Sequence, residues 1–118
     1  MDVRTSRYHN VAILSVNGRL DALSTPLLTQ TIQEQIAAGT IFLVADLQKV
    51  DYLSSAGIKT LLKGTQQVRR QGGDLRIASP RAQVKFVLHL AGVESVIKIY
   101  SHVVRATVSF LPGAVRGA

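Results

Sequence analysis

Two adjacent serines, Ser54 and Ser55, are the side chains of this sequence best placed to do chemistry. They stand between a short apolar run at residues 41–46, typical of a buried strand, and a helical pattern that begins at residue 56. Serine is a preferred helix N-cap, because its hydroxyl accepts a backbone N–H that lacks a partner inside the helix. The positive end of the helix dipole would also tolerate a phosphate at this place. Local chemistry alone therefore leaves two alternatives open, simple capping or a phosphorylation switch.

The serines belong to a longer run of residues that matches a known family pattern. The matching positions are Asp46, Leu47, Val50, Tyr52, Leu53, Ser54, Ser55, Ala56, Gly57, Ile58, Leu61 and Leu62. Two further blocks lie at the expected separations, one upstream at residues 18–28 and one downstream at residues 72–100. Together the three blocks resemble the STAS domain, and specifically the stand-alone anti-sigma factor antagonists of bacterial partner-switching systems. The resemblance extends over about residues 4–110.

This resemblance implies a phosphorylation-controlled binding module and not an enzyme. In the family, the unmodified antagonist binds an anti-sigma factor that is also a serine kinase with a histidine-kinase-like ATPase fold, and this frees the sigma factor. Phosphorylation breaks that complex, and a phosphatase of the PP2C type reverses it. Ser55 is the expected acceptor and Ser54 the second choice. The acceptor stays open because Ser54 replaces the usual aspartate and Ala56 replaces a hydroxyl that is often the modified one.

The resemblance also implies a partner surface, made by the loop after the second strand and the start of the second helix. Its expected members are Arg19, Asp21, Ser24, Ser54, Ser55, Gly57, Ile58 and Lys59. Plainer roles remain open for several of them. Asp21 could cap the following helix, Gly57 could reflect tight helix–sheet packing, and Lys59 with Lys63 could be a solvated face or could meet acidic residues of a kinase. Asp46 is expected to end its strand and to hold the following loop through backbone N–H groups.

The distribution of charge suggests a second class of partner. Residues 1–59 carry five basic and five acidic side chains, whereas residues 60–118 carry nine basic and two acidic ones, which accounts for the net charge of +7. A basic half is typical of proteins that meet nucleic acid, anionic lipid or acidic proteins. The basic residues are dispersed and lack interleaved aromatics, which disfavours nucleic-acid binding. If the chain instead bound nucleic acid or anionic lipid through residues 60–118, the contacts would be Lys63, Arg69, Arg70 and Arg76.

Composition excludes several other functions. The chain has no cysteine, so disulfides, thiolate metal ligands and a cysteine nucleophile are absent. Its three histidines are scattered, and no glycine-rich phosphate loop precedes a helix, so we expect no metal site, no cofactor and no catalysis. The sequence contains neither a membrane-spanning apolar run nor a signal-peptide pattern, and a cytoplasmic protein is expected.

The elements that must position these residues follow from the periodicity. Strands are expected at 3–8, 11–16, 41–46, 75–78 and 97–100, with a loop over residues 47–53. Helices are expected from Ser24 to Gly39, and at 56–71, 80–90 and 101–110. The pattern predicts one α/β domain with parallel central strands, and the resemblance adds a mixed sheet of about five strands with about four helices. Residues 111–118 are expected to form a loose tail.

An alternative to the switch is a constitutive scaffold or oligomer subunit with the same fold. The first strand reads as an edge strand, so the expected oligomeric state is a monomer or a weak dimer.

Overall fold

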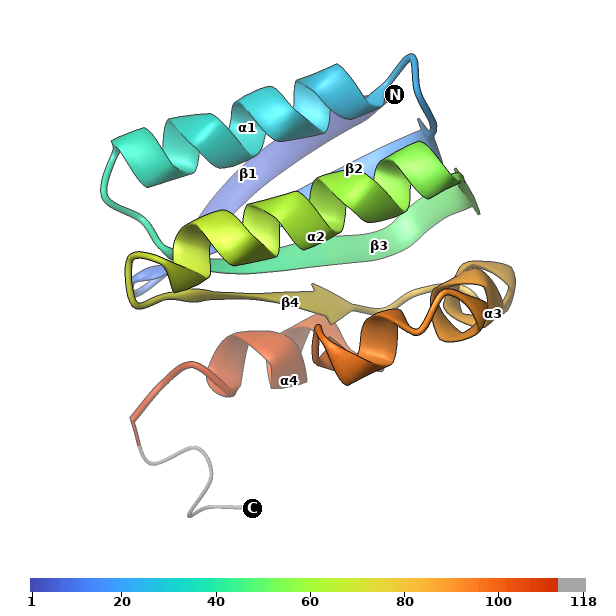
Figure 1. Cartoon of the computed structure of the whole chain (residues 1–118). Helices are drawn as coiled ribbons and strands as arrows, with labels where there is room; N and C mark the ends of the chain where they lie inside the picture. Colours follow the sequence, from blue (N-terminus) through green and yellow to red (C-terminus); the bar gives the residue numbers. More distant parts are fainter. Residues whose placement is uncertain (113–118) are drawn as a thin grey trace.

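The alternation of strand and helix patterns produces a five-stranded sheet with helices on both faces (Figure 1). The computed structural model describes residues 1–112. Its strands are β1 (Asp2–Tyr8), β2 (Val11–Leu20), β3 (Phe42–Leu53), β4 (Asp74–Ala78) and β5 (Ile99–Tyr100). Its helices are α1 (Thr25–Ala37), α2 (Ser55–Arg69), α3 (Ala82–Leu90) and α4 (Val103–Val108), with a short 3-10 helix, η1 (Val93–Ser95).

The strands lie side by side in chain order, from β1 at one edge to β5 at the other. β1 and β2 form an antiparallel hairpin, whereas β2, β3, β4 and β5 are parallel to one another. The predicted fold class, a mixed sheet of five strands with parallel central strands and four helices, is confirmed for the described residues. The prediction of an edge strand at the N-terminus is also confirmed.

The core is divided between the two faces of the sheet, because successive side chains of a strand point in opposite directions. In β4, Leu75 and Ile77 are buried in the larger cluster, which also takes in the inner faces of α1, α2 and α3. Ala78, the next residue, is buried in a smaller cluster with Ala106 of α4. Figure 1 shows the result: α1 and α2 lie on one side of the sheet and α4 on the other.

The loop predicted over residues 47–53 is wrong, because β3 continues to Leu53. The buried residues of this segment are Leu47, Val50 and Leu53, so they recur every third residue and not every second. The pairing of β3 with β2 contains two register shifts, and each places one extra residue on β3. Such β-bulges break the period of two on which strand prediction depends, which is why the segment resembled a loop.

Asp46 therefore lies inside β3 and does not end the strand as predicted. Its expected contact is nevertheless present: Oδ1 accepts a hydrogen bond from the N–H of Gln48 at 3.1 Å. This bond lies at the first bulge, where Ser15 pairs with Asp46 and the next paired residues are Asn17 and Lys49. The carboxylate thus satisfies a backbone donor where the pairing is irregular.

Other differences concern the ends of elements. β2 extends to Leu20, β5 keeps only two residues, α3 begins at Ala82, and α4 is shorter than predicted. Most of the predicted tail at 111–118 lies outside the described residues; Leu111 packs against the smaller cluster.

The burial of the core predicts that alanine substitution at two leucines changes the free energy of unfolding by very different amounts. Leu61 of α2 is completely buried, whereas Leu90 at the end of α3 is 69% exposed. We expect Leu61→Ala to lower the free energy of unfolding by about 2–5 kcal/mol, because it leaves a cavity under α2. The matched control Leu90→Ala should change it by less than about 0.5 kcal/mol. Urea unfolding followed by circular dichroism measures both, and equal losses would contradict this packing.

Candidate functional site

The predicted site residues come together where β2 and β3 end. These neighbouring parallel strands pair Arg19 with Tyr52 and Leu20 with Leu53, so the segment after β2 and the start of α2 are adjacent. The N–H of Ser54 donates a hydrogen bond to the carbonyl of Leu20 at 3.0 Å. Two segments more than thirty residues apart in the chain therefore meet where the parallel strands β2 and β3 end.

Ser54 is the N-cap of α2. Its hydroxyl accepts a hydrogen bond from the N–H of Gly57 at 3.3 Å and donates one to the carbonyl of Leu20 at 3.2 Å. The side chain is half-buried, and its backbone is extended, as an N-cap requires. The Ser54 hydroxyl is therefore engaged both as donor and as acceptor.

Ser55 differs from its neighbour in each of these respects. It is the first residue of α2 and is exposed, and no hydrogen bond within residues 1–112 involves its hydroxyl. The first turn of α2 contains no acidic residue, so no side-chain carboxylate there compensates the positive end of the helix dipole. An anion on Ser55 would face solvent at a place where negative charge is stabilised.

Gly57 was expected on the partner surface, but the structure places it beneath that surface. It is buried, and a Cβ built on it would lie 2.8 Å from the carbonyl oxygen of Leu20 and 2.7 Å from a methyl of Leu53. The close approach that excludes a side chain is therefore to the end of β2. Of the other residues expected in this helix, Ile58 is half-buried and Lys59 is exposed.

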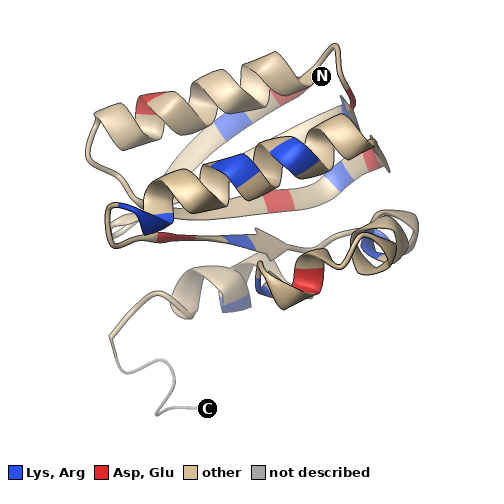
Figure 2. Ribbon diagram, viewed as in Figure 1, with Lys and Arg blue, Asp and Glu red and all other residues tan. Residues whose placement is uncertain are grey.

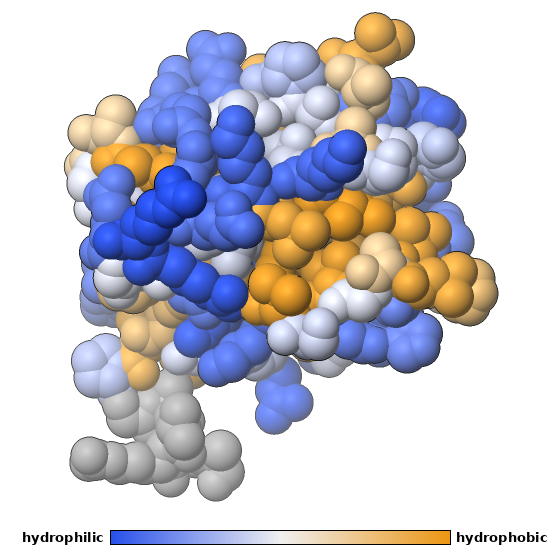
Figure 3. Space-filling view, viewed as in Figure 1, coloured by the Kyte–Doolittle hydropathy of each residue, from blue (hydrophilic) through white to orange (hydrophobic). Residues whose placement is uncertain are grey.

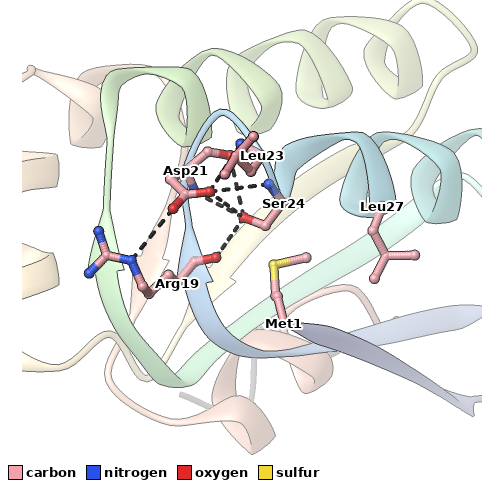
Figure 4. A pocket seen from close by; sticks show the side chains of 6 residues that line it. All are labelled: Met1, Arg19, Asp21, Leu23, Ser24 and Leu27. Atoms are coloured by element: carbon pink, nitrogen blue, oxygen red, sulfur yellow. Dashed lines mark hydrogen bonds and ion pairs between the residues drawn. The ribbon is translucent and has the colours of Figure 1, made fainter.

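The loop after β2 is organised around the carboxylate of Asp21. Its Oδ1 accepts hydrogen bonds from the N–H groups of Leu23 and Ser24, both at 3.1 Å, and its Oδ2 lies 3.5 Å from Nε of Arg19 (Figure 4). The hydroxyl of Ser24 donates to the carbonyl of Arg19 at 2.6 Å and accepts from the N–H of Asp21 at 2.9 Å. The guanidinium of Arg19 also stacks over the ring of Tyr52, 4.1 Å from its centroid. These contacts hold the loop against β3.

Two opposing effects act on the pKa of Asp21. Desolvation in the loop raises the pKa, while hydrogen bonds from the backbone and hydroxyl of Ser24, from the N–H of Leu23 and from Arg19 lower it. The hydrogen bonds prevail, and the pKa lies below its ordinary value. The carboxylate is consequently ionised at neutral pH.

A hollow of about 400 Å³ adjoins this loop, and Figure 4 shows its lining. Polar groups of Arg19, Asp21 and Ser24 share it with apolar side chains that sequence reasoning did not single out, namely Met1, Leu23 and Leu27. Leu23 is 93% exposed. The sequence signal for this exposed leucine was its place between Asp21 and Ser24 in a turn, although no periodicity marked it. Leu27 lies on α1 and is 41% exposed.

The four basic residues named for binding nucleic acid or anionic lipid differ in their contacts. Arg69 donates to Asp74 at 2.9 Å and to the carbonyl of Val96 at 2.7 Å. Arg76 also pairs with Asp74, and its side chain is only 13% exposed. Lys63 on α2 and Arg70, the C-cap of α2, remain exposed. Two of the four cations are thus engaged within the fold.

Within residues 1–112, no group of three or more His, Cys, Asp or Glu side chains is arranged to hold a metal ion. No helix in this part of the chain combines the length and apolar character that a membrane crossing requires.

The family model described as STAS domain matches residues 2–106. The chain is 27% identical over 99 residues to the anti-sigma-F factor antagonist RsfB of Mycobacterium tuberculosis, a match that covers 84% of this chain and 80% of RsfB.

Solved structures also resemble this one. An anti-sigma factor antagonist from Mycobacterium paratuberculosis superposes with a TM-score of 0.83 at 25% identity, covering 92% of each chain. The Bacillus cell fate determinant SpoIIAA in its phosphorylated form has a TM-score of 0.66 at 13% identity, covering 83% of this chain and 90% of SpoIIAA. At that identity, the likeness to SpoIIAA shows the fold alone.

The position of Gly57 predicts the sign of a substitution. In an unconstrained helix, Gly→Ala stabilises by about 0.8–1.0 kcal/mol. Here the added Cβ meets the backbone of β2, so we expect Gly57→Ala to lower the free energy of unfolding by about 1–3 kcal/mol. Ser55→Ala, an exposed change in the same turn, should stay within about 0.5 kcal/mol. A stabilised Gly57→Ala variant in urea unfolding would refute the close contact.

The lowered pKa of Asp21 predicts a dependence of stability on pH. Since the folded-state pKa is below the unfolded-state value, the carboxylate contributes stability above the unfolded pKa and loses it as pH falls through the folded pKa. We expect Asp21→Asn to be less stable than the native chain at neutral pH and to approach it in acid. Unfolding free energies measured across the acid range test this, and a constant difference would count against it.

Proposed function

Because this chain belongs to the STAS domain family, we propose that it is an anti-sigma factor antagonist whose binding is controlled by phosphorylation at the start of α2. Two similar proteins support the first part, since RsfB and the protein from Mycobacterium paratuberculosis are both named as anti-sigma factor antagonists. A similarly folded protein described in a phosphorylated form, SpoIIAA, supports the second part. The protein acts by binding and performs no catalysis.

The observation that carries the proposal is the unequal state of the two serines. The hydroxyl of Ser54 is held between Leu20 and Gly57, and a phosphate there would remove the proton that it donates to the carbonyl of Leu20. The hydroxyl of Ser55 is exposed and open to a kinase. Ser55 is therefore the acceptor, although Ala56 occupies a position where other family members carry a second hydroxyl.

Phosphorylation acts at the surface and leaves the fold intact. A phosphate adds about −1.5 to −2 charges and three acceptor oxygens. The N-terminus of α2 accommodates that charge, because its first N–H groups point toward it. The modified domain stays folded and loses its partner through bulk and repulsion at the interface.

The partner is an anti-sigma factor with serine kinase activity and a histidine-kinase-like ATPase fold, and a PP2C-type phosphatase removes the phosphate. The partner surface combines the loop of Arg19, Asp21 and Ser24 with the exposed start of α2 at Ser55, Ile58 and Lys59. Gly57 and Ser54 contribute from beneath by fixing the position of α2 on the end of β2. The engagement of Arg69 and Arg76 by Asp74 argues against a nucleic-acid surface in this half of the chain.

The first test is phosphopeptide mass spectrometry on the protein isolated from its own cells, covering the tryptic fragment at residues 50–59. We expect phosphate on Ser55, loss of the phosphopeptide in Ser55→Ala, and its retention in Ser54→Ala despite the loss of an N-cap worth about 1 kcal/mol. Ser101→Ala, which removes an exposed serine near another helix start, is the control and should change nothing.

The second measurement is a pull-down with and without ATP. The native chain should release an ATP-binding partner when ATP is added, whereas Ser55→Ala should retain it. Absence of phosphate under several growth and stress conditions, with binding that ATP leaves unchanged, would instead indicate a constitutive scaffold. Phosphate on Ser54 would overturn the choice of acceptor.

A further inference from the structure

One exposed line of side chains runs along α2 from the serine that we propose is phosphorylated. With 3.6 residues per turn, Ser55, Lys59, Lys63, Gln66 and Arg70 fall within about 40° of the direction of Lys59. All five are exposed. We call them the α2 stripe, and Figure 2 shows basic positions in blue along α2.

The positive charge of the α2 stripe is uncompensated. No acidic residue occurs between Tyr52 and Gly73, and within residues 1–112 no ion pair involves Lys59, Lys63 or Arg70. Arg69, next in the chain to Arg70, is instead bound to Asp74. Three cations are thus left facing outward while a neighbouring cation is used internally.

The border of the stripe is apolar on one side. Ile58 and Leu62 are partly exposed, and on the helix they lie about 60–100° from Lys59. Figure 3 shows a large apolar area beside the hydrophilic band over α2. Apolar area bordered by charged groups is the composition of a protein interface, whereas a groove for single-stranded nucleic acid combines basic residues with aromatic side chains.

A second copy of this chain is a poor source of the complementary charge, because its net charge is +7. Four of its seven acidic side chains also contact basic side chains of their own fold: Asp2 with Arg4, Asp21 with Arg19, Asp74 with Arg69 and Arg76, and Glu94 with His89. The occupant that the charges fit is an acidic surface on a different protein.

We infer that the α2 stripe is the docking surface for an acidic face of the anti-sigma factor, and that phosphate on Ser55 disables it by pairing with Lys59. This inference rests on the proposed function and specifies its partner chemistry and its switch. Ser55 and Lys59 are four residues apart, the spacing at which helical side chains meet, and an anion N-terminal to a cation is the favourable order. About two negative charges reduce the stripe from three positive charges to about one.

The first experiment measures association of the full chain with the anti-sigma factor captured by Ser55→Ala, at several salt concentrations. The test variant is Lys59→Glu, Lys63→Glu and Arg70→Glu combined. The control is Lys85→Glu, Lys98→Glu and Arg105→Glu, three exposed cations outside the stripe whose reversal changes the net charge equally. We expect the stripe variant to associate at least about tenfold more slowly and with little salt dependence, and the control to stay within about twofold of the native chain.

The outcomes distinguish a failure of the α2 stripe from a failure of the proposed function on which it rests. Equally slowed association of both triple variants would indicate a general electrostatic effect and would overturn the docking role of the α2 stripe. Association at the native rate in both variants would overturn it as well. In both cases ATP-dependent release by the native chain would leave the proposed function standing. If Ser55→Ala captures no ATP-binding anti-sigma factor, the proposed function fails and the inference fails with it.

The second experiment requires no partner. Phosphoserine is incorporated genetically at position 55, and its second ionisation is followed by phosphorus NMR. We expect the pKa to lie below the value of about 6 for free phosphoserine, to rise in Lys59→Ala, and to stay constant in Lys85→Ala. A pKa that does not respond to Lys59→Ala would overturn the pairing.

Discussion

The carbonyl oxygen of Leu20 joins the end of β2 to the start of α2. It accepts the backbone N–H of Ser54 at 3.0 Å and the Ser54 hydroxyl at 3.2 Å, and only a residue without a Cβ fits beside it at Gly57. Two hydrogen bonds to one buried acceptor, with Gly57 packed closely beside it, leave α2 little freedom to shift or rotate. The direction of Ser55, and of every outward residue along the helix, depends on this junction.

At the same junction, two chemically identical side chains make different contacts. Ser54 is used to satisfy backbone groups, and its hydroxyl is not free for other chemistry. Ser55 is one residue further, and the geometry of the first helical turn directs it to solvent. Because Ser54 makes the capping contacts, a charge added to Ser55 would leave those hydrogen bonds in place.

The basic residues in the second half of the chain fall into two groups. Arg69 and Arg76 meet at Asp74, and Arg76 also stacks on Phe110 at 4.0 Å, so these cations connect α2 and β4 to the C-terminal segment. The remaining cations of α2 have no such internal role in the described residues. A net charge alone could not separate these groups, since partners such as Asp74 and Phe110 are brought to them only by folding.

Much of the fold was determined by the sequence itself. Apolar runs of period two and 3.6, together with turn and capping residues, predicted each strand and helix in order, and their alternation predicted the parallel sheet. Those signals are local, so they are visible without tertiary structure. The second half of β3 was missed because its regularity is not local: two bulges against β2 convert the spacing of Leu47, Val50 and Leu53 to three.

The site divides in the same way. Residue types and spacing placed two serines at a helix start and an aspartate after a strand, and the family resemblance connected them. Only the tertiary structure shows that Ser54 and Ser55 differ in their contacts and that Gly57 lies beneath the surface. It also shows that Leu23 and Leu27 line the hollow beside Asp21. The physical reason is that exposure and hydrogen bonding depend on groups distant in the chain, and the carbonyl of Leu20 lies 34 residues before Ser54.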